Sequence, residues 1–278
     1  MRHEEGFFTG VRGARIYHQC WLPDGEPRAA LLIVHGLAEH SGRYGNVVQH
    51  LVPLGYAAYA PDHLGHGRSE GARVFVERFA DYTTTLKTFF DMVRGRQPGK
   101  PVFLLGHSLG ALIEAAYLLD HQAELAGAVL SGPLVKVPDN ISPAVVAASK
   151  LLSVVMPKLG VAAVDAADVS QDPAVVQAYI DDPLVYRGKT TARLAAEMLK
   201  AMQRVSAEAG HITLPVLLLQ GGADRLVNPA GAQMLYDTVG SADKTLHIYD
   251  RFCHEVFNEP GCARVLRDVE VWLEAHLP

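Results

Sequence analysis

The sequence predicts an α/β fold, with a mostly parallel central sheet that helices cover on both faces. Two observations lead to this prediction. Short apolar runs alternate along the chain with segments of helical spacing, an order typical of parallel sheets. The apolar runs are also continuous, as Ala29–Val34 illustrates, which indicates strands buried on both faces. The 278 residues, of which 49 % are hydrophobic, suit one large α/β domain.

The predicted elements follow one another in a regular order. Two alternating segments open the chain, and because only Arg12 and Gly13 separate the second from the first, they should form an antiparallel hairpin. The segment 79–94 places Phe79, Leu86 and Phe90 at helical spacing. The predicted strands are 7–11, 14–21, 29–34, 56–60, 102–105, 127–130, 216–219 and 245–249. The predicted helices between them are 44–54, 79–94, 109–119, 229–238 and 262–276.

The segment from 134 to 210 interrupts this alternation. It contains no convincing strand, and its helical candidates are 143–156, 173–180 and 191–206. We therefore expect residues 1–133 and 211–278 to form the core of the fold, and residues 134–210 to form a helical cap. Ligands of open α/β sheets bind at the carboxyl ends of the strands, so the cap would cover the site there.

Two predicted cap helices have apolar surfaces. The helix 143–156 is strongly apolar, but Lys150 and Lys158 interrupt the run, so it is a poor membrane span. This helix either lies on a lipid bilayer or micelle or packs inside the cap. The helix 191–206 has one apolar face that either belongs to the core or lines a pocket. That face consists of Leu194, Ala195, Met198, Leu199 and Met202.

Composition excludes several function classes. The formal net charge is −5 and no basic block stands out, so we expect no nucleic-acid partner. Cys20, Cys253 and Cys262 are an odd number without CxxC spacing, which argues against a disulfide framework and a zinc site. We expect neither a metal nor a cofactor. Residues 1–6 have no apolar core like that of a signal peptide, so we expect a cytoplasmic protein, with peripheral membrane contact left open.

The pentapeptide Gly106-His107-Ser108-Leu109-Gly110 is the strongest indication of chemistry. The apolar run Val102–Leu105 leads into it, and a helix-forming run leaves it. A serine on a sharp turn between a buried strand and a helix is a nucleophile elbow, in which small flanking residues let the backbone turn tightly. Ser108 is therefore the candidate nucleophile.

A serine nucleophile needs a base and a group that orients the base. On this fold the acid and then the histidine follow the serine along the chain. Asp224 lies in the loop after the strand 216–219, and His254 lies between the last strand and the last helix. These two residues complete the candidate triad. Asp139 is a weaker alternative for the acid because it falls in the cap. Three other histidines are less suitable as the base: His247 is inside a strand, and His211 and His276 are poorly placed.

Backbone N–H groups should stabilise a developing oxyanion next to Ser108. One comes from the residue after the nucleophile, here Leu109, and a second from the loop after the strand 29–34. Leu37 is the candidate donor in that loop. Five polar residues lie near these loops, and we expect them to hold the loops in place rather than to react: Glu39, His40, Arg43, Asp62 and His63. We expect Cys253 to be a packed side chain.

Several of these stretches resemble one known family. Residues 35–44 read HGLAEHSGRY and residues 62–69 read DHLGHGRS. With the elbow, Gly222–Asp224 and the region of His254, they are similar to the motifs of the monoacylglycerol lipase and lysophospholipase group of α/β-hydrolases, in the same order. Ala111 stands where many relatives have a second glycine. The resemblance implies the α/β-hydrolase fold, esterase chemistry on a monoacylglycerol or similar lipid ester, and a triad of Ser108, Asp224 and His254.

Two other interpretations stay open. The same triad would serve another serine hydrolase, such as a lysophospholipase, a short-chain carboxylesterase, an acyltransferase or a hydrolase of C–C bonds. A protein of a different class would use the fold to bind a small molecule without catalysis, but such proteins usually lack a triad member. Transient membrane contact through the cap is a further expectation, and the sequence implies no particular oligomeric state.

Overall fold

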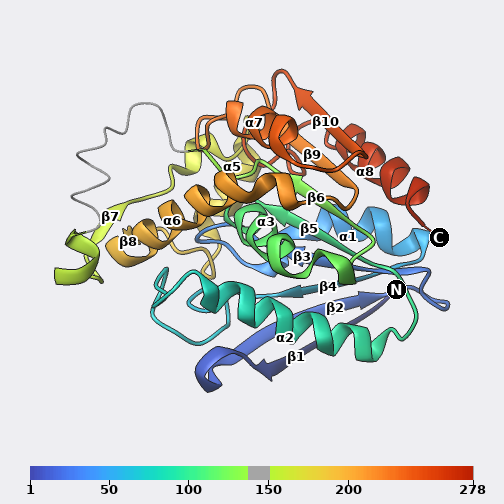
Figure 1. Ribbon diagram of the computed structural model, residues 1–278, viewed down its shortest axis with the longest axis horizontal. Helices are drawn as coiled ribbons and strands as arrows, with labels where there is room; N and C mark the ends of the chain where they lie inside the picture. The colour runs from blue at the N-terminus through green and yellow to red at the C-terminus, as the bar shows by residue number, and fades with distance from the viewer. Residues whose placement is uncertain (137–150, 278) are drawn as a thin grey trace.

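The computed structural model describes residues 1–136 and 151–277 and is built around an eight-stranded sheet. The strand order is β1-β2-β4-β3-β5-β6-β9-β10, with β1 at one edge and β10 at the other (Figure 1). Only the β1–β2 and β2–β4 pairs are antiparallel. The strands are β1 Arg2–Thr9, β2 Arg15–Leu22, β3 Ala29–Val34, β4 Tyr56–Pro61, β5 Val102–His107, β6 Gly127–Ser131, β9 Val216–Gly221 and β10 Lys244–Tyr249. The predicted fold class is therefore confirmed, as is the opening hairpin.

Helices cover both faces of this sheet because its central strands are apolar on both sides. On one face, α1 (Gly45–Leu51) and α8 (Ala263–Ala275) pack on side chains such as Ile33 and Leu105. On the other face, α2 (Ala80–Arg96) and α3 (Leu109–His121) share an apolar cluster with residues such as Leu32 and Leu104, α7 (Ala230–Thr238) packs on β9 and β10, and α6 (Ala192–Glu208) packs on α3. Strands β3 to β6 are completely buried, which is why their sequences read as unbroken apolar runs.

The predicted helix 44–54 is shorter than the pattern suggested. The α-helix covers only Gly45–Leu51, and 3₁₀ turns precede and follow it. Pro53 lies in the second turn, where it cannot donate to an α-helical ladder. Gly55 then ends the segment with a φ of 99°, in the left-handed region that glycine tolerates.

The segment between β6 and β9 lies beyond the carboxyl ends of the parallel strands, at the left of Figure 1. Its described part contains α5 (Pro173–Asp181), α6, and a two-stranded sheet of β7 (Gly160–Ala162) and β8 (Thr190–Thr191). The expectation of an all-helical segment is therefore wrong. Strands of three and two residues are too short to show an alternation. The predicted helix 143–156 lies mostly outside the described residues, but 151–155 are helical.

Substitution of Trp272 tests how α8 is held on the sheet. Its side chain is buried, and its ring meets Phe103 of β5 edge-on at 6.1 Å between centroids. Trp272→Ala should lower the free energy of unfolding by about 3–5 kcal/mol, because truncation of a buried aromatic leaves a cavity. Urea denaturation followed by circular dichroism measures this change.

The neighbouring residue provides the control. Val271 is on the same helix but is 60 % exposed, so Val271→Ala should change the free energy of unfolding by less than about 0.5 kcal/mol. Equal losses in the two variants would contradict this packing of α8.

Candidate active site

Ser108 occupies a strained turn between β5 and α3. Its φ is 56° and its ψ is −116°, a conformation that a residue with a side chain rarely adopts. Three backbone bonds hold the turn: the N–H of Ser108 donates to the carbonyl of Ser131 at 2.9 Å, and its carbonyl accepts from Leu112 at 3.2 Å and from Leu134 at 3.3 Å. The geometry is that of a nucleophile elbow, which presents the serine hydroxyl at the end of the sheet.

The two glycines of the pentapeptide make this turn possible. A Cβ on Gly110 would collide with the carbonyl oxygens of Val34 and His35, because α3 begins directly against the end of β3. A Cβ on Gly106 would collide with the carboxyl group of Glu114 and with the backbone of Gly110. Ala111 is completely buried, so the start of α3 has room for its methyl group.

Asp224 and His254 come together at the same end of the sheet. Nδ1 of His254 donates to Oδ2 of Asp224 at 2.7 Å, and both side chains are buried. The other oxygen of Asp224 accepts the N–H groups of Leu226 at 2.9 Å and Val227 at 3.0 Å. Gln220 also donates to Oδ2, at 3.0 Å. A carboxylate that is fixed in this way keeps the Nδ1 proton in place and leaves Nε2 free to accept one.

The electrostatics of the pair favour a charged imidazole next to a charged carboxylate. Burial alone would lower the pKa of His254, but the charge and hydrogen bond of Asp224 outweigh it and raise that pKa above its ordinary value. Burial would raise the pKa of Asp224, but His254 and the two backbone N–H groups lower it. His107, whose ring lies tilted against that of His254 at 4.6 Å between centroids, has a pKa lowered to about 3, first by burial and then by His254. It therefore stays neutral.

A cavity of about 300 Å³ lies beside Ser108 and His254. Ser108, His254 and Leu37 line it, and Leu109 is the first residue of α3. The first N–H groups of a helix have no partner within the helix, so this position suits the donor role expected of Leu109. Most of the wall is apolar and includes four of the five residues of the predicted face of α6: Ala195, Met198, Leu199 and Met202. The fifth, Leu194, is buried in the core.

The polar network expected around the loop after β3 is present. Glu39 accepts the N–H of Gly36 at 2.6 Å and the hydroxyl of Tyr44 at 2.8 Å. Asp62 accepts the N–H and the hydroxyl of Ser41 at 2.9 and 2.6 Å. The N–H of His63 donates to Nε2 of His35 at 2.9 Å. These bonds fix the backbone on both sides of Leu37.

Sequence reasoning did not identify Glu255. Arg43 donates to Glu39 at 2.9 Å and makes two bonds to Glu255, at 2.5 and 2.8 Å. It thus connects the loop after β3 with the residue that follows His254. Arg43 and Glu255 are 212 residues apart, so no local pattern links them. The only indication of Glu255 in the sequence was that a charged residue directly follows the candidate base, His254.

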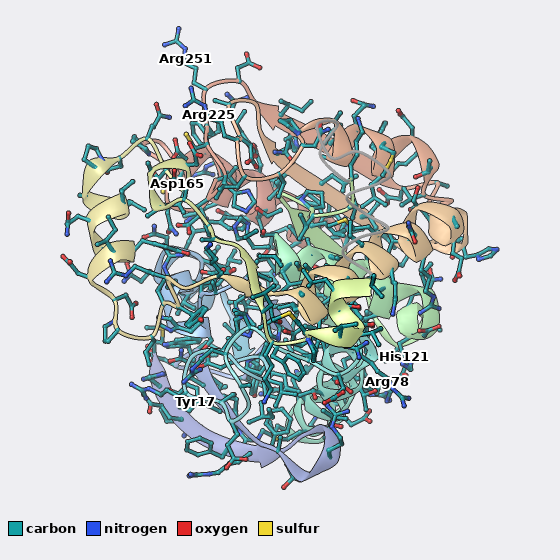
Figure 2. The ribbon with its side chains drawn as sticks, turned by 90° about the vertical axis from the view of Figure 1, so that its left-hand side faces the viewer. Tyr17, Arg78, His121, Asp165, Arg225 and Arg251 are labelled. Carbon is teal, nitrogen blue, oxygen red and sulfur yellow. The ribbon has the colours of Figure 1, made fainter. Side chains whose placement is uncertain are left out.

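The cap is bonded to both loops. The N–H of Tyr186 donates to the carbonyl of Ala38 at 2.8 Å, and the N–H of Glu255 donates to the carbonyl of Val169 at 2.9 Å. His40 also contacts Asp182 of the cap at 2.8 Å. Figure 2 looks onto this end of the molecule, where Asp165 of the cap lies near the Arg225 loop and Arg251 extends outwards. The cap thus forms one wall of the site and also supports the two loops.

Asp139, the alternative acid, lies outside the described residues. The three other candidate histidines are not in this site. His247 is inside β10, His276 follows α8 and bonds Asp243 at 2.9 Å, and His211 ends a 3₁₀ turn. All three cysteines are free. Within residues 1–136 and 151–277, no group of three or more His, Cys, Asp or Glu is arranged to hold a metal ion.

Comparisons with known proteins agree with the resemblance seen in the motifs. Residues 25–261 match the family described as serine aminopeptidase S33, Hydrolase_4. The chain is 41 % identical to a monoacylglycerol lipase of Mycolicibacterium smegmatis over 98 % of both chains. It is 36 % identical to a human monoglyceride lipase, covering 94 % of this chain and 87 % of that one. The crystal structure of a monoacylglycerol lipase of Paleococcus ferrophilus superposes with a TM-score of 0.85 at 31 % identity, over 94 % of this chain and 99 % of that chain.

The reactivity of Ser108 can be tested without a substrate. A fluorophosphonate probe should label the protein at one serine, because the probe reacts with a serine that a base activates. Ser108→Ala should abolish the labelling while the circular dichroism spectrum stays that of the wild type.

Ser206 serves as the control residue. It is exposed on α6, so Ser206→Ala should be labelled as fast as the wild type. Labelling that persists in Ser108→Ala would mean that another serine is the nucleophile.

Proposed function

The chain belongs to the serine aminopeptidase S33 family of α/β-hydrolases, and we propose that it hydrolyses monoacylglycerols through Ser108, His254 and Asp224. It is a lipid ester hydrolase by its relationship to monoacylglycerol lipases over nearly its full length. The observation that supports these residue roles is the placement of Ser108, on its strained turn, and of His254 along one largely apolar cavity, with Asp224 bonded to His254.

The reaction follows from the positions of these groups. His254 takes the proton of the Ser108 hydroxyl through Nε2 as the oxygen attacks the ester carbonyl. Asp224 stabilises the imidazolium that forms. The N–H groups of Leu37 and Leu109 donate to the oxyanion. His254 then protonates the departing glycerol oxygen, and a water molecule hydrolyses the acyl-enzyme by the same steps.

The lining of the cavity suits an acyl chain. Met198 and Met202 of α6 line it together with Val164 and Val169, and all four residues belong to the proposed cap. An apolar chain in such a cavity gains free energy for each methylene removed from water. The proposed division of the chain into a core, 1–133 and 211–278, and a cap, 134–210, assigns chain recognition to the cap.

The carboxylates of the cavity do not suit the aminopeptidase activity in the family's description. An aminopeptidase needs an anion that can bind the substrate's ammonium group. Glu39 and Glu255 line the cavity, but Glu39 already accepts bonds from Gly36, Tyr44 and Arg43. Both oxygens of Glu255 are bonded to Arg43. Carboxylate oxygens that already accept these hydrogen bonds interact only weakly with the ammonium group of a further ligand. An ester is therefore the better substrate.

We also propose that the protein contacts a membrane or micelle. No helix within the described residues is long and apolar enough to cross a bilayer. Several large apolar side chains of the cap are nevertheless exposed near Lys158, and such a surface suits the interface of a membrane or micelle that holds the substrate. They are Leu151, Val154, Val155, Met156, Leu159 and Val161.

A substrate panel tests the proposed reaction. Among monoacylglycerols of graded length, lysophosphatidylcholine, p-nitrophenyl acetate, a vinylogous diketone and alanyl p-nitroanilide, the monoacylglycerols should have the highest kcat/KM. Each methylene that the cavity accommodates should raise kcat/KM by up to about fourfold, because it contributes about 0.8 kcal/mol. Ser108→Ala should lower kcat by at least about a thousandfold. Preference for lysophosphatidylcholine or for the anilide would overturn the proposed substrate.

Vesicle sedimentation tests the exposed surface. Val154→Asp should reduce binding to phosphatidylcholine vesicles by about tenfold, because a valine buried in lipid contributes about 1.5 kcal/mol. Hydrolysis of a water-soluble ester should stay unchanged.

Val271→Asp is the matched control because Val271 is similarly exposed but lies on α8. Equal loss of binding in both variants, or in neither, would contradict a specific role of the cap surface.

A further inference from the structure

A buried group of three charges lies next to His254. Arg43, Glu39 and Glu255 have side chains that are 9 %, 5 % and 7 % exposed. Two carboxylates meet one guanidinium, so the group has more negative than positive charge. Burial alone would lower the pKa of Arg43, but Glu255 and Glu39 raise it, so Arg43 stays charged. Its guanidinium also lies over the ring of Tyr179 of the cap, at 4.7 Å from the centroid.

The position of the Glu255 carboxylate is fixed. Both oxygens bond to Arg43, and one also accepts from Asn258 at 2.9 Å. The backbone N–H of Glu255 is bonded to the cap at Val169. A charge that is held in this way acts on its neighbours from a constant distance, and at low exposure solvent screens it little.

Four titratable groups surround the His254 imidazole. Asp224, from the loop after β9, is bonded to it, and His107, from the end of β5, lies against it. Glu39, from the loop after β3, and Glu255, from the same loop as His254, line the same cavity as His254. His107 is neutral. After burial, which lowers the pKa of His254, Asp224 raises it most, and Glu255 and Glu39 raise it further.

We propose that Glu255, held by Arg43, sets the pH at which His254 becomes the neutral base, and that Arg43 links this setting to the geometry of the oxyanion loop. Glu255 is then a positioning residue of the reaction, which acts through His254 and not on the substrate. Arg43 has two effects, because it reduces the negative charge near the imidazole and fixes Glu39 beneath Gly36. This inference rests on the proposed function only in taking His254 as the base.

Glu255→Gln is the direct test, because it removes the charge and keeps an acceptor for Arg43. The base must be neutral, so activity falls as the pH falls through the pKa of His254. Without the charge of Glu255, the acid limb of kcat/KM should move to lower pH by about half a unit. One unit below the wild-type midpoint, the variant should retain about two to three times more of its plateau activity than the wild type. Glu39→Gln should move the limb in the same direction.

Two further variants separate charge from structure. Arg43→Lys keeps the positive charge but loses the bidentate geometry, so it should lower plateau kcat while the midpoint stays near that of the wild type. Glu259→Gln removes another buried carboxylate of the same loop, whose oxygens bond Gln171, and should leave the midpoint unchanged.

NMR titration of the His254 imidazole gives a readout that does not depend on activity. Its signal is the one missing from His254→Asn, and its midpoint should fall in Glu255→Gln. An unchanged or higher midpoint, by NMR and by kinetics, would overturn the inference. Absence of ester hydrolysis in the wild type would instead overturn the proposed function, and the NMR titration would still decide whether Glu255 acts on His254.

Discussion

The strained backbone at Ser108 is the constraint on which the rest of the structure depends. A φ of 56° at a serine survives only if the surrounding packing outweighs its cost. That packing requires β3, β5 and the start of α3 to approach more closely than a side chain at Gly106 or Gly110 would permit. The fully buried parallel strands supply the rigid support. The sheet is therefore more than a scaffold, because its central strands hold the nucleophile in a conformation that a short peptide would not keep.

The loops around Ser108 are held by polar contacts as well as by apolar packing. Asp224 fixes the imidazole, Glu39 fixes the backbone at Gly36, and Arg43 connects the two sides of the cavity. Such buried ion pairs add little net stability, because desolvation offsets much of their attraction. Their value here is geometric: a carboxylate with every oxygen bonded cannot move without breaking several bonds at once.

Local patterns account for what was predicted, and contacts between distant residues account for what was missed. The elbow, the acid and the histidine were identified because each directly follows a buried strand, and the carboxyl ends of parallel strands meet at one edge. The Arg43–Glu255 bond joins residues from opposite ends of the chain, and no periodicity reports it. The strands β7 and β8 were missed for a different reason. They are too short for an alternation, and their pairing exists only because the cap folds back on itself.

The two backbone bonds between the cap and the catalytic loops have a consequence for how such proteins diverge. The bonds of Tyr186 to Ala38 and of Glu255 to Val169 use only main-chain atoms, so any residue except proline can donate them. The side chains at these two positions can therefore change while the two attachment points persist. Cap segments exchanged between homologues should be tolerated when the joints preserve those two main-chain positions, whatever residues other than proline occupy them. Modularity of this kind separates the evolution of recognition from that of reactivity.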